Sequence, residues 1–378
     1  MLTLDDDEWL LADIGGTYAR FAHWRVATAA GPFQRLRNEH YADLAEAVSA
    51  FEAAAGAHAP RAALALATPI LGDQLRLTNR DWQFSATSLR AACGWRRLYI
   101  VNDFVAAAAG LPDLHDGDRQ PLQAGTSGVT SGGTRSVTGG SAIADTRGGT
   151  IGRAGARPWL LLGPGTGLGC AVLLDPGAAA EHVLASEAGH MSFAPPDPRL
   201  DLPLQRAANQ RWGRVSWERL LSGSGLAWLH GELARDLAGG APDPVRAGES
   251  AEGRPDGAID AAEVVRRALA GDGLAQAAVT RFCGWLGACA GDLCLAFGAD
   301  GGVHLTGGVL NGLGAAFDVE AFLRAFRDKG RAAERLARVP IWRLNCDDLA
   351  FRGLRRIVVG RVRAPGLLID DGGLAELA

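Results

Sequence analysis

An apolar run leads into a glycine turn in the stretch Trp9-Leu10-Leu11-Ala12-Asp13-Ile14-Gly15-Gly16-Thr17. The run predicts a β-strand over Trp9–Ile14, and the small residues that follow it predict a tight turn. Alternation of apolar and polar residues from Arg20 to Val26 predicts the returning strand. The chain therefore opens with a β-hairpin.

A second hairpin of the same design follows about 150 residues later. Its expected parts are a strand at Trp159–Leu162, a turn at Gly163-Pro164-Gly165-Thr166-Gly167-Leu168-Gly169 and a strand at Cys170–Leu174. Two such units in one chain indicate a domain-scale duplication. We expect its two halves to face each other across a cleft.

Strands and helices alternate between and after the two hairpins, which is typical of an α/β fold. The longest expected helix carries apolar residues at three- and four-residue steps. The expected strands are Ala62–Thr68, Gln74–Thr78, Arg97–Val101, His182–Ala185 and Val303–Thr306, and the expected helices are Thr87–Cys93, Phe104–Gly110, Gly273–Phe297 and one near Val309. Two stretches lack a usable pattern: 125–157 predicts a flexible insertion and 239–257 a surface loop.

Length and composition limit the possible functions. The 378 residues suffice for two domains that each bury a core. A net charge of −4 argues against nucleic acid or an anionic membrane as a partner. No apolar run approaches the roughly 20 residues that cross a bilayer, and the acidic Met1–Glu8 lacks the order of a signal peptide. We therefore expect a soluble, cytoplasmic protein.

Two residue types are informative through their spacing or scarcity. Cys283, Cys289 and Cys294 suit neither a zinc site nor a redox pair, and their helical context predicts small core residues. Lys329 is the only lysine and follows no glycine-rich loop, so the Gly-Lys-Ser/Thr phosphate loop is absent. Arginine, backbone amides, helix ends or Mg²⁺ must then meet the charge of any phosphate.

The two glycine turns offer what a phosphate chain needs, which is unobstructed backbone N–H groups with a hydroxyl beside them. Gly15, Gly16 and Thr17 supply these in one half, and Gly165, Thr166 and Gly167 in the other. Asp13 is placed to hold the water shell of Mg²⁺. A tight hairpin needs glycine in any case, so each turn alone is also explained structurally. The spacing of the second turn lacks G-x-G-x-x-G and does not support a dinucleotide fold.

Three further positions carry polar side chains where a ligand could lie. Asn102-Asp103 ends a strand and begins a helix, so Asp103 could accept a proton from a sugar hydroxyl or simply cap the helix. Glu187 and His190 lie in a loop and together suit neighbouring sugar hydroxyls, although either alone could be solvated. Glu218 lies in a first helical turn, where a carboxylate is favourable without any function.

These residues together resemble the bacterial ATP-dependent glucokinases of the non-ROK group, within the hexokinase and actin-like ATPase superfamily. The resemblance runs from Leu10 to about Leu344. It rests on eight blocks in the family's order: Ala12–Thr17 with Ala19-Arg20, Leu77-Thr78-Asn79 with Trp82, Asn102-Asp103-Phe104, Gly165–Gly169, Glu187–Pro195, Ser216–Leu226, Gly302–Gly308 and Asp328–Arg331.

The resemblance implies a role for each of these residues. Asp103 matches the catalytic Asp of the family. Asn102, Glu187, His190 and Glu218 match its glucose-binding residues, which moves Glu218 from a structural to a functional interpretation. The nucleotide side is implied to comprise Ala12, Asp13, Ile14, Gly15, Gly16, Thr17, Thr166, Gly167, Gly307 and Gly308. ATP and Mg²⁺ are the implied cofactors, with the metal held through ATP and water near Asp13.

The family's architecture implies a two-domain actin-like (ribonuclease H-like) α/β fold with an interdomain cleft. The small domain would comprise 1–112 and 348–378 and the large domain 113–347, and family members are commonly dimers. The sequence also departs from the family pattern. Tyr18 replaces the usual Asn, Ala188 the usual Gly, and Asp347, Asp348, Phe351 and Arg352 replace a small-residue ending.

The predicted function is glucokinase activity, in which glucose receives the γ-phosphoryl group of ATP while Asp103 takes the proton of its 6-hydroxyl. A kinase for another hexose, such as mannose or fructose, is the closest alternative. A non-catalytic sugar-binding regulator of the same fold is a second alternative, which the departures suggest. An ATP-hydrolysing actin-like or chaperone-like protein is a third, although it would not need the sugar-binding set.

Overall fold

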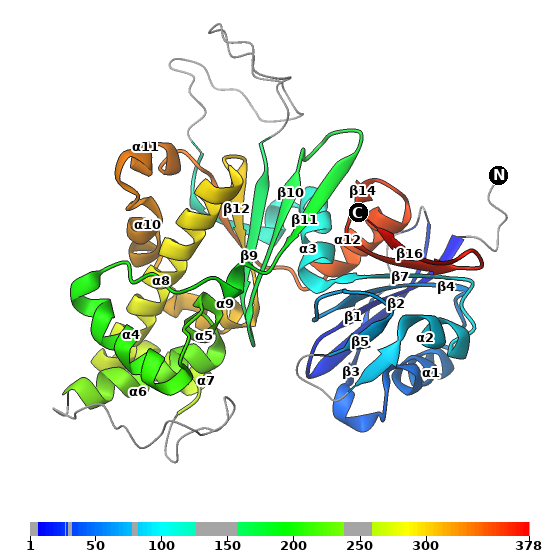
Figure 1. The fold of residues 1–378 in the computed structure, drawn as a ribbon, viewed down its shortest axis with the longest axis horizontal. Coiled ribbons are helices and arrows are strands. Elements are labelled where there is room, and N and C mark those ends of the chain that lie inside the picture. Colours follow the sequence, from blue (N-terminus) through cyan, green and yellow to red (C-terminus); the bar gives the residue numbers. More distant parts are fainter. Residues whose placement is uncertain are drawn as a thin grey trace, which may run out of the picture.

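The computed structural model describes residues 7–26, 28, 32–77, 82–125, 157–237 and 259–377. Within these residues the chain forms two seven-stranded sheets and a short two-stranded one, with helices between and around them (Figure 1). The predicted loop at 239–257, nearly all of the predicted insertion at 125–157 and the pair Thr78-Asn79 lie outside the described residues. In the described part, no helix is both long and apolar enough to cross a membrane.

The first sheet has the strand order β16-β15-β7-β4-β1-β2-β3. β1, β4 and β7 run parallel, and β2, β3, β15 and β16 are added antiparallel to their neighbours. The strands are β1 Glu8–Ile14, β2 Tyr18–Arg25, β3 Gln34–Arg37, β4 Arg61–Leu66, β7 Arg97–Asn102, β15 Gly366–Asp370 and β16 Gly373–Leu377. β5 Gln74–Arg76 and β6 Gln83–Ser85 form the two-stranded sheet.

The second sheet has the strand order β14-β11-β10-β9-β12-β13-β8. Its strands are β8 Arg119–Gln123, β9 Trp159–Pro164, β10 Leu168–Leu174, β11 Glu181–Ser186, β12 Gly302–Leu305, β13 Ile341–Leu344 and β14 Val362–Arg363. β11-β10-β9-β12-β13 repeats the order and directions of β3-β2-β1-β4-β7. The predicted duplication is therefore confirmed at the level of topology.

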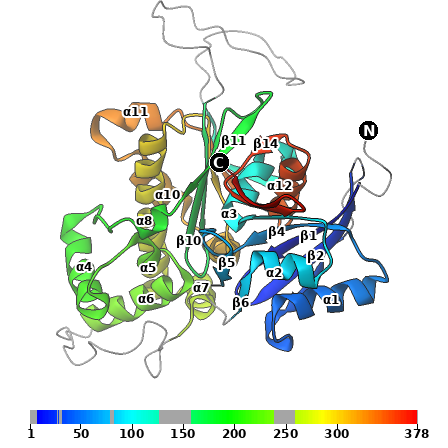
Figure 2. The same cartoon turned by 45° about the vertical axis from the view of Figure 1, so that its right-hand side comes forward.

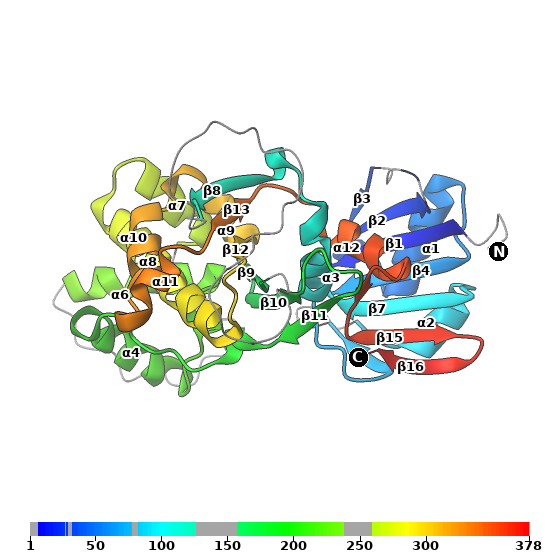
Figure 3. The ribbon, with the colours of Figure 1, turned by 90° about the horizontal axis from the view of Figure 1, so that it is seen from above.

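The helices form three layers around the two sheets, as Figures 1 and 2 show. α3 and α12 lie between the sheets, α1 and α2 cover the outer face of the first, and the others cover the outer face of the second (Figure 3). The helices are α1 Leu44–Ala55, α2 Ala86–Ala92, α3 Asp103–Gly110, α4 Pro198–Trp212, α5 Trp217–Leu220, α6 Gly223–Leu237, α7 Ala261–Leu269, α8 Gly273–Phe297, α9 Gly308–Leu313, α10 Val319–Arg327, α11 Ala333–Leu336 and α12 Leu349–Val358.

The central layer joins the two halves through one apolar core. Leu11 and Ala63 from the first sheet, Leu161 and Leu173 from the second, and Leu354 from α12 all belong to it. α3 has alanine at four consecutive positions, 106–109, and small side chains let two helices and two sheets approach closely. The position of α3 relative to both sheets is thereby fixed by packing, which matters because Asp103 is its first residue.

The unusual C-terminal residues organise the connections between the two sheets. Arg352 is 9% exposed and its guanidinium donates to Asp118 at 2.5 Å and to Asp348 at 2.8 Å. Asp118 precedes β8 and Asp348 precedes α12, so one arginine holds both connections together. Phe351 stacks on Phe33 with ring centroids 5.5 Å apart. The altered ending therefore provides structural contacts in this chain.

Several predictions are confirmed to within a few residues. α8 spans Gly273–Phe297 as predicted, and Cys283, Cys289 and Cys294 are buried, unpaired core residues within it. The second hairpin differs from its prediction because β9 continues through Gly163 to Pro164 and β10 resumes at Leu168. The turn itself is therefore only three residues long.

Candidate active site

The first glycine turn joins β1 to β2 and closes at the pair Ile14 and Ala19. The N–H of Gly15 donates to the carbonyl of Tyr18 at 3.0 Å, and Thr17 is exposed at the tip. Ala12 and Ile14 are fully buried in the core beneath α1 and α2, so these two residues can reach a ligand only through their backbone. Gly15, Gly16 and Thr17 present the accessible surface of the turn.

Asn38 braces this turn from below. It is 1% exposed and its side-chain amide donates to the carbonyls of Gly15 at 2.8 Å and Gly16 at 3.2 Å. Its backbone N–H donates to the carbonyl of Thr17 at 3.0 Å. With its carbonyl oxygens held by the protein, the turn keeps a fixed conformation. Sequence reasoning missed Asn38 because it lies about 20 residues from the turn, outside any local motif.

Asp13 lies on the face of β1 that points toward α3 and α12 and is paired with Arg20. Arg20 also donates to the carbonyl of Asp347 and lies over the rings of Phe33 and Phe351, at 5.3 Å and 5.8 Å from their centroids. The carboxylate of Asp13 is thus held in place by a well-supported arginine.

Asp103 is the first residue of α3 and its side chain is partly exposed. Burial of the carboxyl group, reinforced by the negative charge of Asp13, raises its pKa to about 7. Hydrogen bonds from the N–H groups of Phe104 and Asp103 and from Asn102 act in the opposite direction but are outweighed. A carboxyl group that titrates near neutrality is suited to general base catalysis.

The helix cap belongs to Asn102, not to Asp103. The side-chain oxygen of Asn102 accepts from the N–H groups of Phe104 at 2.9 Å and Val105 at 3.3 Å, and its amide donates to the carbonyl of Thr68 at 3.3 Å. The capping alternative for Asp103 is therefore wrong, because the preceding residue already takes that role. Asp103 is instead the first residue of α3 and does not cap it.

The second turn is seated against α3. Gly165, Thr166 and Gly167 form its tip, and the N–H of Gly165 donates to the carbonyl of Gly167 at 2.7 Å. The ring of Phe104 lies against Gly163 and Gly169, and a Cβ atom at Gly169 would overlap that ring. Glycine is required at Gly169 for this close approach. Phe104 thereby ties Asp103, its neighbour in sequence, to the second hairpin.

The predicted sugar-binding residues gather on the other side of the same hairpin. Glu218 accepts from the N–H of Leu168 at 3.1 Å. Nδ1 of His190 lies 3.9 Å from Glu218 Oε1, and its Nε2 lies 3.8 Å from Glu187 Oε2. Arg214 donates to the backbone carbonyl of His190 at 2.5 Å, a contact that sequence reasoning did not anticipate. The structure therefore brings Glu187 and His190, from one loop, together with Glu218 from α5.

Gly307 and Gly308 lie behind the second turn, between β12 and α9. Gly307 has φ of 108°, and a Cβ atom there would overlap the carbonyl oxygen of Pro164. Both observations require glycine. Gly308 has open space beside its Cα. The backbone of this pair is accessible next to the turn formed by Thr166 and Gly167, as expected for the nucleotide side.

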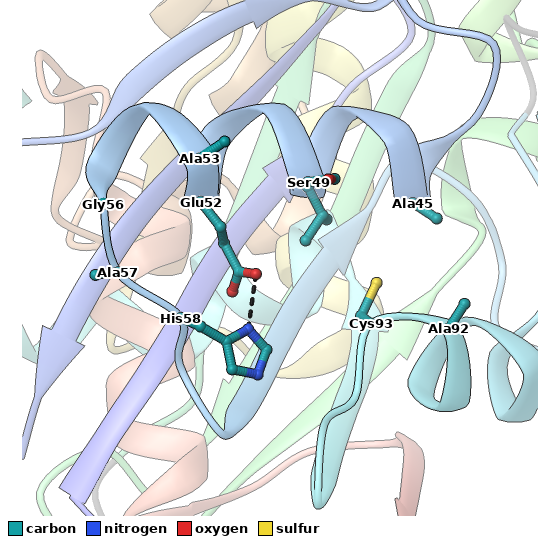
Figure 4. A pocket seen from close by; sticks show the side chains of 10 residues that line it. Ala45, Ser49, Glu52, Ala53, Gly56, Ala57, His58, Ala92 and Cys93 are labelled. Atoms are coloured by element: carbon teal, nitrogen blue, oxygen red, sulfur yellow. Dashed lines mark hydrogen bonds and ion pairs between the residues drawn. The ribbon is translucent and has the colours of Figure 1, made fainter.

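A separate hollow of about 510 Å³ between α1 and α2 lies outside this arrangement (Figure 4). Figure 4 shows His58 paired with Glu52, 2.8 Å apart, and Cys93 facing the same space. Burial raises the pKa of the Cys93 thiol to about 12, so the thiolate that reacts as a nucleophile is scarce at neutral pH. The arrangement gives no reason to place catalysis in this hollow.

Comparison with known proteins identifies the family of this chain. The family model described as "Glucokinase" matches residues 10–359. The glucokinase of Chromobacterium violaceum is 38% identical over 350 residues, covering 91% of this chain and 87% of that protein. The bifunctional protein glk of Burkholderia pseudomallei is 37% identical over 358 residues, and the chain spans 49% of its length.

Solved structures give the same result. The crystal structure of a glucokinase from an Antarctic psychrotroph has a TM-score of 0.71 and 28% identity, covering 93% of this chain and 99% of that chain. A glucokinase from Balamuthia mandrillaris, solved in complex with glucose, has a TM-score of 0.68 at 20% identity, covering 94% of each chain, and supports the two-domain α/β fold. With the family model and a closely related glucokinase both matching over most of its length, this chain belongs to the glucokinase family.

Proposed function

We propose that Asp103 is the general base of an ATP-dependent glucokinase and accepts the proton of the 6-hydroxyl of glucose. One observation carries this proposal: Phe104, next to Asp103, and Glu218 contact the two sides of the same hairpin. A base and a sugar-binding cluster that are both held against one short hairpin can serve one substrate molecule. The pKa of about 7 for Asp103 suits a base that works at neutral pH.

Glucose would be bound by Glu187, His190 and Glu218, with Asn102 contacting the sugar as well as capping α3. Two carboxylates and an imidazole provide acceptors and a donor for adjacent hydroxyls. Mannose or fructose would use the same groups, so hexose preference depends on how each hydroxyl meets them. Glucose is the first candidate because the relatives are named glucokinases.

The phosphates of ATP would lie between the two turns. Backbone N–H groups of Gly16 and Thr17 would bind them on one side, where the hydrogen bond from the Gly15 N–H to the Tyr18 carbonyl shapes the turn. Thr166, Gly167, Gly307 and Gly308 would bind them on the other side, and Ala12 and Ile14 would contribute backbone alone. Among the described residues, no group of three or more His, Cys, Asp or Glu side chains could hold a metal ion by itself. The proximity of Asp13 and Asp103 nevertheless suits a divalent cation that arrives with ATP, with Asp13 holding its water.

In the proposed reaction, the two halves close on the sugar and exclude water that would hydrolyse ATP. Asp103 takes the proton as the oxygen of glucose forms its bond to phosphorus and the bond to ADP breaks. Two units would move relative to each other. The small domain comprises residues 1–112 and 348–378, and the large domain comprises residues 113–347. β15 and β16, which join the first sheet, support this division, whereas β14 pairs with the second sheet.

The same proposal covers the branch of the family, the oligomeric state and the location of the protein in the cell. We place the chain in the non-ROK branch and the actin-like ATPase superfamily, supported by buried cysteines in α8 and by the duplicated sheets. We expect a cytoplasmic homodimer that binds neither nucleic acid nor membrane. Light scattering over a range of protein concentrations tests the dimer, and cell fractionation tests the location.

The first experiment measures ADP release from Mg-ATP with glucose, mannose or fructose. We expect glucose-dependent ADP formation, and a drop in kcat of about 10² to 10⁴ in Asp103→Asn. Asp371→Asn, an exposed aspartate on the first sheet's outer edge, is the matched control and should behave like wild type. If Asp103→Asn keeps more than about a tenth of kcat, the base is wrongly assigned. Glucose binding without stimulation by any hexose would instead indicate a sugar-binding regulator.

A further inference from the structure

Three exposed or half-exposed side chains lie beside the first glycine turn and have no place in the function described so far. Tyr18 pairs with Arg37 across β2 and β3, and Arg20 pairs with Arg35. Directly opposed residues and residues two apart share one face of a sheet. Tyr18, Arg35 and Arg37 therefore lie on the face that carries Arg20 and Asp13, the face toward α12.

The aromatic ring of Tyr18 organises the two arginines. The guanidinium carbon of Arg35 lies 3.6 Å from the centroid of the ring and that of Arg37 lies 5.7 Å from it. Nε of Arg37 donates to the hydroxyl of Tyr18 at 3.4 Å, and this hydrogen bond and the charge of Arg37 lower the pKa of the phenol. We call these three residues the arginine platform. A guanidinium on an aromatic face keeps its charge and its N–H donors.

The platform begins where the turn ends. The carbonyl of Tyr18 accepts from Gly15, and Asn38, which follows Arg37, supports the carbonyls of Gly15 and Gly16. Opposed residues in antiparallel strands have Cα atoms about 5 Å apart. Arg37, opposite Tyr18, and Arg35, two residues before it on the same face, therefore lie close to an anion bound at Gly16 and Thr17.

The positive charge of the platform is only partly balanced. Arg37 pairs with Glu39 at 2.7 Å, whereas Arg35 makes no ion pair with any residue that the structure describes. Other cations are already engaged: Arg20 pairs with Asp13, and Lys329, the single lysine, pairs with Asp292 at 2.6 Å. Phosphates near the first turn need compensating charge, and the platform offers it.

We propose that Tyr18 holds Arg35 and Arg37 in place to bind the terminal phosphate of the nucleotide. The inference rests on the proposed function, which puts the transferred phosphate near Asp103. The first turn follows β1 and Asp103 follows β7, and because β1, β4 and β7 run parallel, both lie at the same edge of the first sheet. Gly307 and Gly308 instead follow β12 of the second sheet. The phosphate chain must then end at the first turn. The family usually has asparagine at this position, and an asparagine side chain has no aromatic ring on which a guanidinium could stack. The arginine platform therefore depends on the presence of tyrosine at position 18.

The experiment compares ATP and ADP binding by calorimetry in Arg35→Gln, Arg37→Gln and the double variant. We expect the Kd of ATP to rise about threefold in each single variant and about tenfold in the double variant, with a much smaller change for ADP. The double variant should also show a weaker dependence of ATP affinity on salt. Arg25→Gln, at the far end of β2 and paired with Glu8, is the matched control and should leave both affinities unchanged.

Variants of Tyr18 distinguish the role of its aromatic ring, which positions the two guanidinium groups, from the role of the arginine charges themselves. Tyr18→Phe keeps the ring and should retain most of the ATP affinity, whereas Tyr18→Asn should resemble the double arginine variant. Lysine at both arginine positions should restore part of the affinity. Equal losses for ATP and ADP, or unchanged ATP affinity in the double variant with its melting temperature preserved, would overturn the proposal. Because calorimetry needs no turnover, it reports on the platform even if glucose-dependent ADP formation fails and the proposed function with it.

Discussion

The two glycine hairpins share a topology but are supported in opposite ways. The first turn is held by a donor, the amide of Asn38, which binds the carbonyls of Gly15 and Gly16. The second is held by an acceptor, the carboxylate of Glu218, which binds the N–H of Leu168. Asn38 contacts only carbonyls of the first turn and uses none of its amides, whereas Glu218 occupies an amide of the second turn and adds negative charge beside it.

Corresponding positions also differ in what they carry. β1 has Asp13 just before its turn, paired with Arg20, and the arginine platform follows it. β9 has only apolar residues and glycine before its turn, and Gly163 and Gly169 leave room for the ring of Phe104. One copy of the duplicated unit thus concentrates charge suited to phosphate. The other provides space for Phe104 of α3 and a support for Glu218, one of the residues proposed to bind the sugar.

Among the substitutions that test this difference between the two hairpins, one at Gly169 should have the largest effect on stability and activity. Gly169→Ala places a methyl group on the ring of Phe104, and overpacking of this kind typically costs about 1–3 kcal/mol of unfolding free energy. Displacement of Phe104 also moves Asp103, so kcat should fall at least tenfold. Chemical denaturation and steady-state kinetics measure the two losses. Gly165→Ala, where a methyl group meets open space, is the control, and equal effects at both positions would contradict the packing argument.

Glu218→Gln tests the acceptor that supports the second hairpin. An amide oxygen can still accept from Leu168, but it loses the charge that strengthens this bond and the contact with His190. We expect the KM for glucose to rise about 10- to 100-fold with the KM for ATP nearly constant. Glu334→Gln, an exposed glutamate on α11, serves as control. A rise confined to the KM for ATP would show that Glu218 serves the nucleotide instead.

Asn38→Ala tests the donor that supports the first turn, and its effect should be smaller and of opposite selectivity. Without the Asn38 amide, the carbonyls of Gly15 and Gly16 lose their hydrogen-bond donor. This loss should lower the free energy of unfolding by about 1–2 kcal/mol. The KM for ATP should rise about threefold to tenfold while the KM for glucose stays constant. Asn209→Ala, on the exposed side of α4, is the control. If Asn38→Ala and Glu218→Gln changed the same KM, the two turns would not differ in function.

The sequence predicted the duplication because it depends on local signals. Each hairpin has an apolar run, small residues in its turn and an alternating return strand, and these lie within about 20 residues. α8 was predicted to the residue for the same reason, since its period continues without a break up to Gly298. Elements with strong local patterns need no knowledge of tertiary contacts.

The supports of the site could not be predicted from sequence because they join distant segments. Asn38 reaches back to Gly15, Phe104 fits between glycines of another sheet, and Arg214 holds the carbonyl of His190. None of these residues carries a local signal of its role. The sequence left open whether Asp103 caps α3, because Asn and Asp cap helices about equally well, and only the geometry shows that Asn102 takes this role.

The dependence of catalysis on pH tests the role of Asp103. Asp103 must be ionised to accept a proton, and its pKa is raised to about 7, so kcat/KM should rise about tenfold per pH unit below 7 and level off above it. The charge of Asp13 contributes to this shift, so Asp13→Asn should move the midpoint to lower pH whatever its effect on absolute rate. The range from roughly pH 5.5 to pH 8 brackets the expected midpoint. If kcat/KM does not change with pH across this range, Asp103 is not a base that titrates near neutrality.

The same pKa shift predicts a stability difference whose sign is independent of catalysis. Because the pKa of Asp103 is raised in the folded state, the unfolded chain releases this proton first as pH rises from about 4, and folding stability then falls until pH reaches about 7. Asp103→Asn removes the titration. The variant should therefore gain stability relative to wild type across this interval and hold a constant advantage above it, as measured by denaturation at several pH values. A variant that loses stability relative to wild type as pH rises would show that the ionised carboxylate is favoured in the fold, and the argument from burial would fail.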